Sequence, residues 1–442
     1  MTAAALAPAD PTLELLRLVR PALDRRLDPS ARAPIAAAGK ADGGGDSLAL
    51  LLTALAWGGA HGRPVVALTV DHGLQPASAG WTRAAAAKAR ALGAQARSLA
   101  WTGPKPHAGL PAAARRARHA LLAEAARAAG ARVLLLGHTA DDLAEAALMR
   151  AHGSSVGGPM EWSPSPAWPE GRGLYLLRPL LAVRRAHLRR MLAETGHDWL
   201  DDPANVDPAY ARARARRALP GAASPAPEPG AALAALARAA LCSEAGVVSI
   251  GRDALLGSDP GAAARFLAMA CVSAGGGDRL PRRGRADDVL RRLRDAPSMV
   301  ATLAGARSVG GPQILILREA GEADRGGLTA IELEPRSTGV WDGRFEAFAE
   351  ADGWSLRPLR GLARRLPELE QSRLRAIPAA ARAALPAAVR GEVVSCPILA
   401  GAGPVTLRCL IGARLAGACG VFAQERDLRR GPDGAGSPGA LS

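Results

Sequence analysis

Cysteine and long apolar runs are both scarce in this sequence. None of the five cysteines precedes Cys242, and no two of them have CxxC spacing. This spacing argues against a disulfide framework, and against a zinc ribbon or iron–sulfur site in the first 241 residues. No stretch of about 18 uninterrupted apolar residues occurs, and residues 1–8 lack the basic start of a secretory signal. We therefore expect a cytoplasmic protein with no membrane segment.

Acidic residues are also in deficit. The chain of 442 residues has 56 Lys and Arg against 41 Asp and Glu, which gives a net charge of +15 and a pI near 11.0. Arginine dominates the basic residues, and arginine is well suited to phosphate recognition. A nucleic acid is therefore the first candidate partner. A coding sequence rich in G and C would also raise the arginine content, so part of this charge could be incidental.

Short apolar runs alternate with amphipathic stretches over the N-terminal half. Strands are expected near 33–38, 64–70, 96–101 and 133–136. Helices are expected near 47–58, 79–92, 111–129 and 140–150. Alternation of this kind predicts an α/β fold with a doubly wound parallel sheet, in which ligands bind beyond the carboxyl ends of the strands.

Composition divides the chain into six expected segments. An N-terminal helix (1–30) precedes the α/β domain (31–219), and a linker rich in Pro, Gly and Ala (220–230) follows. Beyond the linker we expect a helical tRNA-binding middle domain (231–298), a small α+β C-terminal region (299–430) and a disordered tail (431–442).

A glycine-rich loop directly precedes the first long apolar helix. Gly43, Gly44 and Gly45 are followed by Asp46 and Ser47, and the apolar run begins at once. Glycines let the backbone approach a ligand closely, and a helix N-terminus favours anions. This arrangement predicts a phosphate-binding loop, although a glycine loop with no ligand would have the same sequence features.

A second polar cluster follows the strand expected at 133–136. Gly137 and His138 lead into Asp141, Asp142 and Glu145 on the next helix. Carboxylates three or four residues apart share a helix face and repel each other unless a cation or solvent lies between them. They could bind a metal or an ammonium group, or simply cap the helix and face water.

Other polar residues lie where they could reach the same edge of the sheet. Asp71 and His72 follow the strand expected at 64–70, and could contact a nucleotide or complete a turn. Arg115 and Arg118 are three residues apart on a helix and could act together on phosphate, or form a solvated basic face. Arg212 opens a run of alternating arginines that could neutralise an RNA backbone.

Taken in order, these motifs resemble those of the tRNA(Ile)-lysidine synthases, which are PP-loop (N-type) ATP-pyrophosphatases. The resemblance is dense over about 30–220 and rests on segments 43–47, 70–74, 101–106, 112–115, 137–142, 145, 148–150, 177–181, 199, 202–203, 205 and the run from Arg212; 341–345 fits less closely. It implies an adenine nucleotide α-hydrolase-like fold and an ATP-dependent ligase. Such an enzyme adenylates the C2 oxygen of the wobble cytidine of a tRNA(Ile) with a CAU anticodon. Free L-lysine then displaces AMP to give lysidine.

The resemblance also implies roles for individual residues. ATP would be bound by Asp42, Gly43, Gly44, Gly45, Asp46, Ser47, Asp71, His72, Gly137 and His138. Asp46 and Asp141 would place Mg²⁺, and Asp142 and Glu145 would receive the lysine ammonium group. The catalytic set would be Asp46, Asp142, Glu145, Arg115, Arg118 and Arg212. Whether the protein forms a homodimer is left open by the sequence.

One position departs from the family pattern. The family loop begins with Ser where this chain has Asp42. A carboxylate about 4 Å from a phosphate costs about 4 kcal/mol at an effective dielectric constant near 20. Two further hypotheses therefore stand beside an active lysidine synthase: a relative that binds tRNA without catalysis, and another PP-loop tRNA-modifying ATPase.

Overall fold

The structure, a computed structural model, describes residues 11–40, 44–153, 157–199, 228–282 and 284–429. The contacts divide the chain into two compact units. The first comprises residues up to Glu228 and a C-terminal segment that begins at Phe422, and the second runs from Pro229 to Val421. The six segments expected from composition, and the tRNA-binding role of residues 231–298, remain predictions. Asp42, Gly43, Arg212, most of the expected linker and the tail 431–442 lie outside the described residues.

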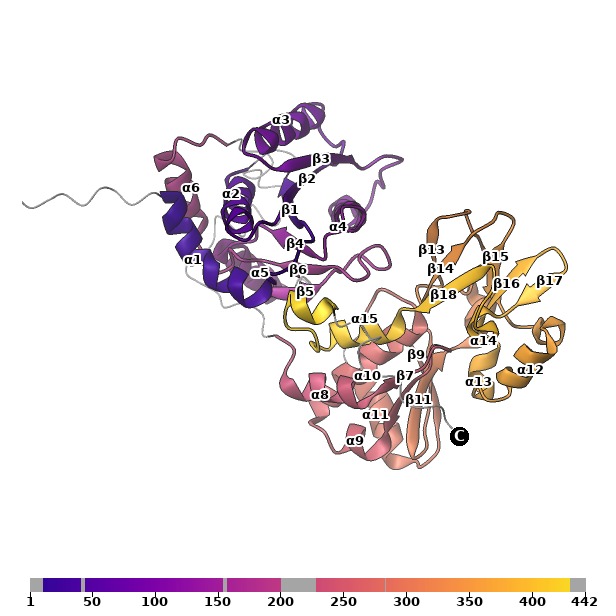
Figure 1. Cartoon of the computed structure of the whole chain (residues 1–442). Helices are drawn as coiled ribbons and strands as arrows, with labels where there is room; N and C mark the ends of the chain where they lie inside the picture. The colour runs from indigo at the N-terminus through magenta and orange to yellow at the C-terminus, as the bar shows by residue number, and fades with distance from the viewer. Residues whose placement is uncertain (1–10, 41–43, 154–156, 200–227, 283, 430–442) are drawn as a thin grey trace, which may run out of the picture. The chain divides into compact units, whose positions relative to one another are not determined.

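A six-stranded sheet, in the order β3-β2-β1-β4-β6-β5, forms the centre of the first unit (Figure 1). All neighbouring strands are parallel except β5 and β6. The strands are β1 (Ile35–Lys40), β2 (Val65–Asp71), β3 (Gln95–Ala100), β4 (Val133–Leu136), β5 (Trp162–Pro164) and β6 (Tyr175–Leu177). The helices are α1 (Pro11–Arg26), α2 (Gly45–Ala60), α3 (Ser78–Ala91), α4 (Leu110–Ala128), α5 (Ala140–Ala151), α6 (Arg185–Glu194) and η4 (Glu425–Arg429). The predicted doubly wound parallel sheet is confirmed.

Strand β1 consists largely of alanine, which is a poor strand former. It begins two residues later than expected and continues to Lys40, because it pairs in register with β2 from Ile35↔Val65 to Lys40↔Val70. Ala37 packs in the core that contains α2, whereas Ala36 and Ala38 pack in the core that contains α4. Burial on both faces therefore overrides the weak intrinsic preference of alanine for strands.

The C-terminal segment of the first unit is held by a buried ion pair. Glu425 accepts hydrogen bonds from Arg63 Nη1 at 2.6 Å and Nη2 at 2.8 Å, and both side chains are almost fully buried. The backbone N–H of Asp28 donates to the same carboxylate at 2.9 Å. Residues more than 360 positions apart in the sequence thus share one core.

The second unit begins with helices packed on an antiparallel sheet in the order β7-β8-β11-β10-β9. Its strands are β7 (Leu241–Cys242), β8 (Val248–Gly251), β9 (Val300–Leu303), β10 (Ala306–Val309) and β11 (Gln313–Arg318). Its helices are α8 (Ala231–Ala239), α9 (Arg252–Leu256), α10 (Pro260–Gly275), α11 (Arg285–Asp295) and η2 (Ala320–Arg325). The segment 231–298, expected to be helical, thus also contains the short strands β7 and β8.

Two small sheets complete the second unit, in the orders β12-β15-β16-β17 and β13-β14-β18. Their strands are β12 (Ile331–Glu332), β13 (Thr338–Trp341), β14 (Phe345–Ala349), β15 (Ser355–Pro358), β16 (Pro386–Arg390), β17 (Val393–Ser395) and β18 (Val405–Cys409). The helices beside them are η3 (Ala363–Arg365), α12 (Glu368–Leu374), α13 (Ala379–Arg382), α14 (Pro397–Ala400) and α15 (Ile411–Ala418).

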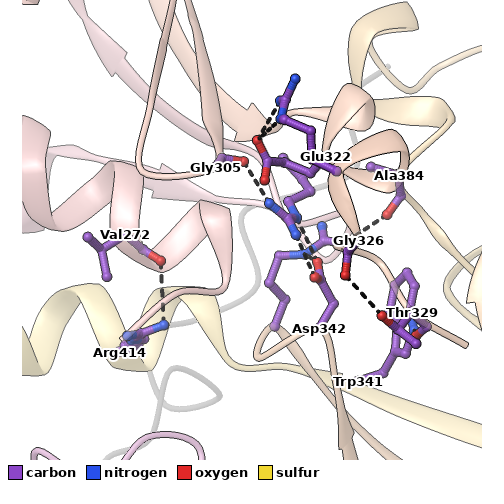
Figure 2. A network of polar contacts seen from close by, with 12 residues as sticks. Val272, Gly305, Glu322, Gly326, Thr329, Trp341, Asp342, Ala384 and Arg414 are labelled. Atoms are coloured by element: carbon purple, nitrogen blue, oxygen red, sulfur yellow. Dashed lines mark hydrogen bonds and ion pairs between the residues drawn. The ribbon is translucent and has the colours of Figure 1, made fainter. Parts of the chain in front are cut away.

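The turn between β13 and β14 is the centre of a buried polar network (Figure 2). Asp342 accepts two hydrogen bonds from Arg318, at 2.7 and 2.8 Å, and one from Arg344 at 2.6 Å. Arg344 also donates to the Ala384 carbonyl at 2.7 Å. Because these groups are buried and paired with one another, we assign the 341–345 motif to the packing of the second unit.

None of the helices in the described part of the chain is long and apolar enough to span a membrane.

Candidate active site

The glycine loop leads into α2 at the carboxyl edge of the parallel sheet. Gly44 is the N-cap, and its carbonyl accepts hydrogen bonds from the N–H groups of Ser47 at 2.8 Å and Leu48 at 3.1 Å. These bonds begin the helix at the glycine loop, so the positive dipole end of α2 lies at this edge, where it favours an anion.

Gly137 brings the end of β4 against the start of α2. A Cβ atom on Gly137 would lie 3.1 Å from the carbonyl oxygen of Asp46. Only glycine allows so close an approach without a shift of one backbone. The two predicted ATP-binding residues Gly137 and Asp46 are thus neighbours.

A cavity of about 50 Å³ lies between the ends of β1 and β2 and helices α2 and α3. Most of its lining is alanine and leucine, with Ser47, Thr69 and Lys88 as the polar side chains. The small side chains of the alanine-rich strands leave this space beside the glycine loop.

The four predicted carboxylates lie around one arginine that the sequence analysis did not select. Arg185, the first residue of α6, donates from Nε to Asp46 Oδ2 at 2.9 Å. Its Nη1 lies 3.3 Å from Glu145 Oε1, and its Nη2 lies 3.3 Å from Asp142 Oδ2. Its backbone N–H donates to Asp141 Oδ2 at 2.7 Å. The structure therefore brings Asp46, Asp141, Asp142 and Glu145 together from α2 and α5.

Arg185 is the guanidinium that the described contacts place among these carboxylates. Asp46, Asp142 and Glu145 supply three carboxylates, and Arg185 supplies one guanidinium that is 12% exposed. The three carboxylates raise the pKa of Arg185 further, against the effect of its burial, so the guanidinium stays charged. Carboxylates held this close together in a largely buried site need positive charge or hydrogen-bond donors beside them.

Asp141 and Asp142 each also support a helix start. Asp142 Oδ2 accepts from the N–H and the hydroxyl of Thr139, both at 2.9 Å, in a capping box at the start of α5. Asp141 accepts from the first N–H of α6 and pairs with Arg184 at 3.2 Å. The structural and functional readings of these acidic residues are therefore compatible, because one carboxylate can cap a helix and face the site.

Two histidines, His119 and His138, lie among arginines beside the carboxylate cluster. His138 accepts at Nδ1 from Arg178 Nε at 3.2 Å, and burial together with Arg178 lowers the pKa of His138 well below its usual value. Burial and the nearby Arg115 and Arg118 lower the pKa of His119 to about 3. At neutral pH His119 and His138 are therefore uncharged, and the arginines supply the positive charge of this region.

Asp71 and His72 lie at the end of β2, as predicted. Asp71 Oδ1 accepts from the N–H of Gly73 at 2.8 Å, which completes a turn. The His72 ring meets Trp101 edge to face at 6.4 Å, and burial and Arg118 lower the pKa of His72. Lys105 Nζ lies 4.0 Å from the centre of the Trp101 ring. This corner of the site thus combines an aromatic surface with positive charge.

The donor set suits Mg²⁺ only in part. No group of three or more His, Cys, Asp or Glu side chains is arranged to hold a metal ion within the described ranges. The buried Asp46 Oδ1 has no hydrogen-bond partner there, whereas both oxygens of Asp141 are engaged. Since Mg²⁺ commonly binds through one or two carboxylates plus substrate phosphates, Asp46 fits this role better than Asp141.

The sequence analysis assigned no role to two arginines of the site, Arg178, which lies in the motif 177–181, and Arg185. Arg178 is buried and also donates to the Met160 carbonyl at 2.7 Å and the Ser163 hydroxyl at 3.1 Å. A signal for Arg185 was available, because clustered carboxylates require a cation and Arg185 is the second of two arginines that follow an apolar run. Nothing in the sequence showed that this run ends beside α5.

Comparisons with known proteins identify the family of this chain. A family model described as a PP-loop domain matches residues 28–222. A tRNA(Ile)-lysidine synthase of Caulobacter vibrioides is 49% identical over 420 residues, which cover 92% of this chain and 98% of that protein. The synthase of Mesorhizobium japonicum is 38% identical over 333 residues, 68% of this chain and 70% of that protein. The synthase of Hyphomonas neptunium is 45% identical over 181 residues, 40% of this chain and 48% of that protein.

The first of these matches extends over nearly the whole length of both chains. It confirms the family that the order of motifs predicted. The structure has the parallel sheet that the family predicts, with the glycine loop at the start of α2 and the carboxylates of α5 beside that helix start. This chain therefore belongs to the tRNA(Ile)-lysidine synthase family.

Proposed function

We propose that this chain joins free L-lysine to C2 of the wobble cytidine of a tRNA(Ile) with a CAU anticodon. In the first step the C2 oxygen of cytosine attacks the α-phosphate of ATP, and pyrophosphate leaves. In the second step the ε-amine of lysine attacks C2, the bond to the C2 oxygen breaks and AMP leaves. The observation that carries this proposal is the cluster of three carboxylates beside the start of α2, because it brings carboxylates suited to an ammonium group close to a helix start suited to phosphate.

The start of α2 and Ser47 are proposed to hold the β- and γ-phosphates of ATP. Their support is the orientation of the first turn of α2, whose N–H groups and dipole favour anions. Mg²⁺, held by Asp46 and the phosphates, would neutralise charge on the leaving pyrophosphate. The unpartnered Asp46 Oδ1 supports this assignment.

Glu145 and Asp142 are proposed to receive the ammonium group of lysine. Glu145 is fully buried, and Asp142 is nearly so. A buried carboxylate needs a cationic or hydrogen-bonding partner, and an amino-acid ammonium group supplies both. Lysine held at this position would lie near the phosphate end of the site, where the adenylated cytidine must be attacked.

Arg115 and Arg118 are proposed to contact phosphate of the activated nucleotide or the tRNA. Both lie close enough to the site histidines to lower the pKa values of His119 and His138. Neutral histidines beside fixed guanidinium groups give a region whose positive charge does not change near neutral pH. Arg212, which the sequence assigned to the same role, lies outside the described residues.

Incorporation of radiolabelled lysine into a tRNA(Ile) transcript tests the proposal directly. We expect transfer that requires ATP and a CAU anticodon, and no transfer to a matched transcript with UAU. Tight tRNA binding without lysine transfer at saturating ATP would instead support the non-catalytic relative. The Asp42→Ser variant then decides whether the loop is responsible, because restored activity would assign the defect to that carboxylate. Light scattering of the purified chain tests the open prediction of a homodimer.

A further inference from the structure

One guanidinium connects the two ends of the candidate site. Arg185 contacts Asp46, which directly follows the glycine loop, and Glu145, which is proposed to bind lysine. These carboxylates belong to different helices, α2 and α5, and Arg185 belongs to a third, α6. A change in the partners of Arg185 at one end must therefore alter its contacts at the other.

Arg185 also takes the place proposed for the substrate ammonium group. Its Nη1 and Nη2 lie 3.3 Å from Glu145 and Asp142, the two residues proposed to bind lysine. Two cations that share the same carboxylates repel each other in a largely buried site. Lysine and the guanidinium in its present position therefore compete.

We propose that Arg185 is a positioning residue that makes lysine binding depend on bound nucleotide. The proposal rests on the function given above. Triphosphate oxygens offer a guanidinium strong bidentate partners, and a nucleotide whose Mg²⁺ engages Asp46 would remove the shortest side-chain contact of Arg185 in the cluster. Both effects draw the side chain from Glu145 and Asp142 toward the phosphates, which opens these two carboxylates to lysine.

This coupling gives the reaction an order. Lysine would bind weakly to the free enzyme and tightly once ATP is in place, so the amine arrives where an adenylate can form. Coupling between two ligands on one protein is commonly 5- to 150-fold and is reciprocal. We expect nucleotide to raise the affinity for lysine at least tenfold, and lysine to raise the affinity for nucleotide by the same factor.

Equilibrium dialysis of radiolabelled lysine against the full chain measures this factor without catalysis. The binding states are free enzyme, enzyme with Mg²⁺, and enzyme with Mg²⁺ and α,β-methylene ATP, which cannot release pyrophosphate. For the unmodified chain we expect at least a tenfold lower Kd for lysine with the analogue. For Arg185→Gln we expect tight lysine binding in all three states, with less than a twofold effect of the analogue.

Two further variants separate coupling from a structural role. Arg190→Gln removes an arginine on the same helix whose side chain is 63% exposed, and it should leave the coupling factor unchanged. Arg185→Lys keeps the charge but loses the fork that spans both carboxylates, so it should retain only part of the coupling. If Arg185→Gln does not fold, Arg185→Lys still tests whether Arg185 couples nucleotide binding to lysine binding.

The outcomes distinguish this inference from the proposed function. If the unmodified chain binds lysine equally well with and without the analogue, the coupling is overturned while lysine ligation stands. If Arg185→Gln or Arg185→Lys keeps the full coupling factor, another residue links the two ends and the inference is wrong. If no state binds lysine and no lysine is transferred to tRNA, the proposed function itself is overturned, and the coupling with it.

Discussion

Arg185 forms an ion pair with Asp46, at 2.9 Å, across 139 positions of sequence. The contact joins the start of α6 to the start of α2 and places Asp142 and Glu145 around the same guanidinium. The sequence left open which cation the clustered carboxylates need. In this structure Arg185 of the chain itself supplies a cation, and the lysine ammonium group is proposed to take its place at Asp142 and Glu145.

Replacing Glu145 by Gln tests the lysine site. The change removes one charge from a buried cluster and keeps the shape of the side chain. A hydrogen bond to a charged group contributes about 1.5–3 kcal/mol, so we expect the KM for lysine to rise about 10- to 100-fold. The KM for ATP should change much less. Steady-state lysine transfer measures both constants, with the exposed Glu124→Gln as control. Equal increases in both constants would contradict a lysine-specific role.

Replacing Gly137 by Ala tests the close contact between β4 and α2. The new Cβ would lie 3.1 Å from the Asp46 carbonyl, so the helix start must shift by a few tenths of an ångström. We expect the KM for ATP to rise several-fold, because the phosphate-binding N–H groups of α2 move with it. Gly59→Ala near the other end of α2 meets no atom within 4 Å and should leave the KM unchanged. An unaltered KM for ATP in Gly137→Ala would show that the loop does not depend on this contact.

Stability should fall in mild acid because the folded protein holds His119 neutral. Its folded pKa is about 3, below the value of 6.5 expected when unfolded. Below pH 6.5 the unfolded state therefore binds more protons, and stability is lost until the pH reaches about 3. At about 1.4 kcal/mol per pH unit, the loss at pH 5 relative to pH 7 is about 2 kcal/mol from this group.

Urea denaturation at pH 7 and pH 5 measures this dependence. In His119→Gln the difference in unfolding free energy between the two pH values should shrink by about 2 kcal/mol relative to the unmodified chain. The exposed His107→Gln should leave the difference as it is. An unchanged difference in His119→Gln would mean that His119 is not held neutral.

Replacing Glu425 by Gln tests the anchor of the C-terminal segment. The change leaves the buried Arg63 without a charged partner, which commonly costs about 3–5 kcal/mol. We expect a loss of about that size in the unfolding free energy of the first unit, measured by denaturant titration. Glu392→Gln removes a fully exposed partner of Arg365 and should have no measurable effect. Equal stabilities of the two variants would show that the segment does not contribute to the core.

The order of strands and helices in the first unit could be predicted from the sequence, because short apolar runs and the polar residues that follow them are local features. Alternating apolar runs predicted strands β1 to β4 within about two residues at most ends, and the position of polar residues after them predicted which edge carries the site. The alanines of β1 were a weak signal. Their strand conformation depends on burial between α2 and α4, which composition alone does not reveal.

By itself, then, the sequence determined the fold class, the family and the set of carboxylates, since these follow from periodicity and from the order of short motifs. Only the tertiary structure decided which cation the carboxylates share and which glycine brings α2 against β4. It also placed Phe422 and Glu425 in the first unit, although the sequence counted them with the C-terminal region. The physical reason is the same in each case. A buried charge takes its partner from whichever element the fold brings within hydrogen-bonding distance, and for residues on different elements the sequence separation does not give that distance.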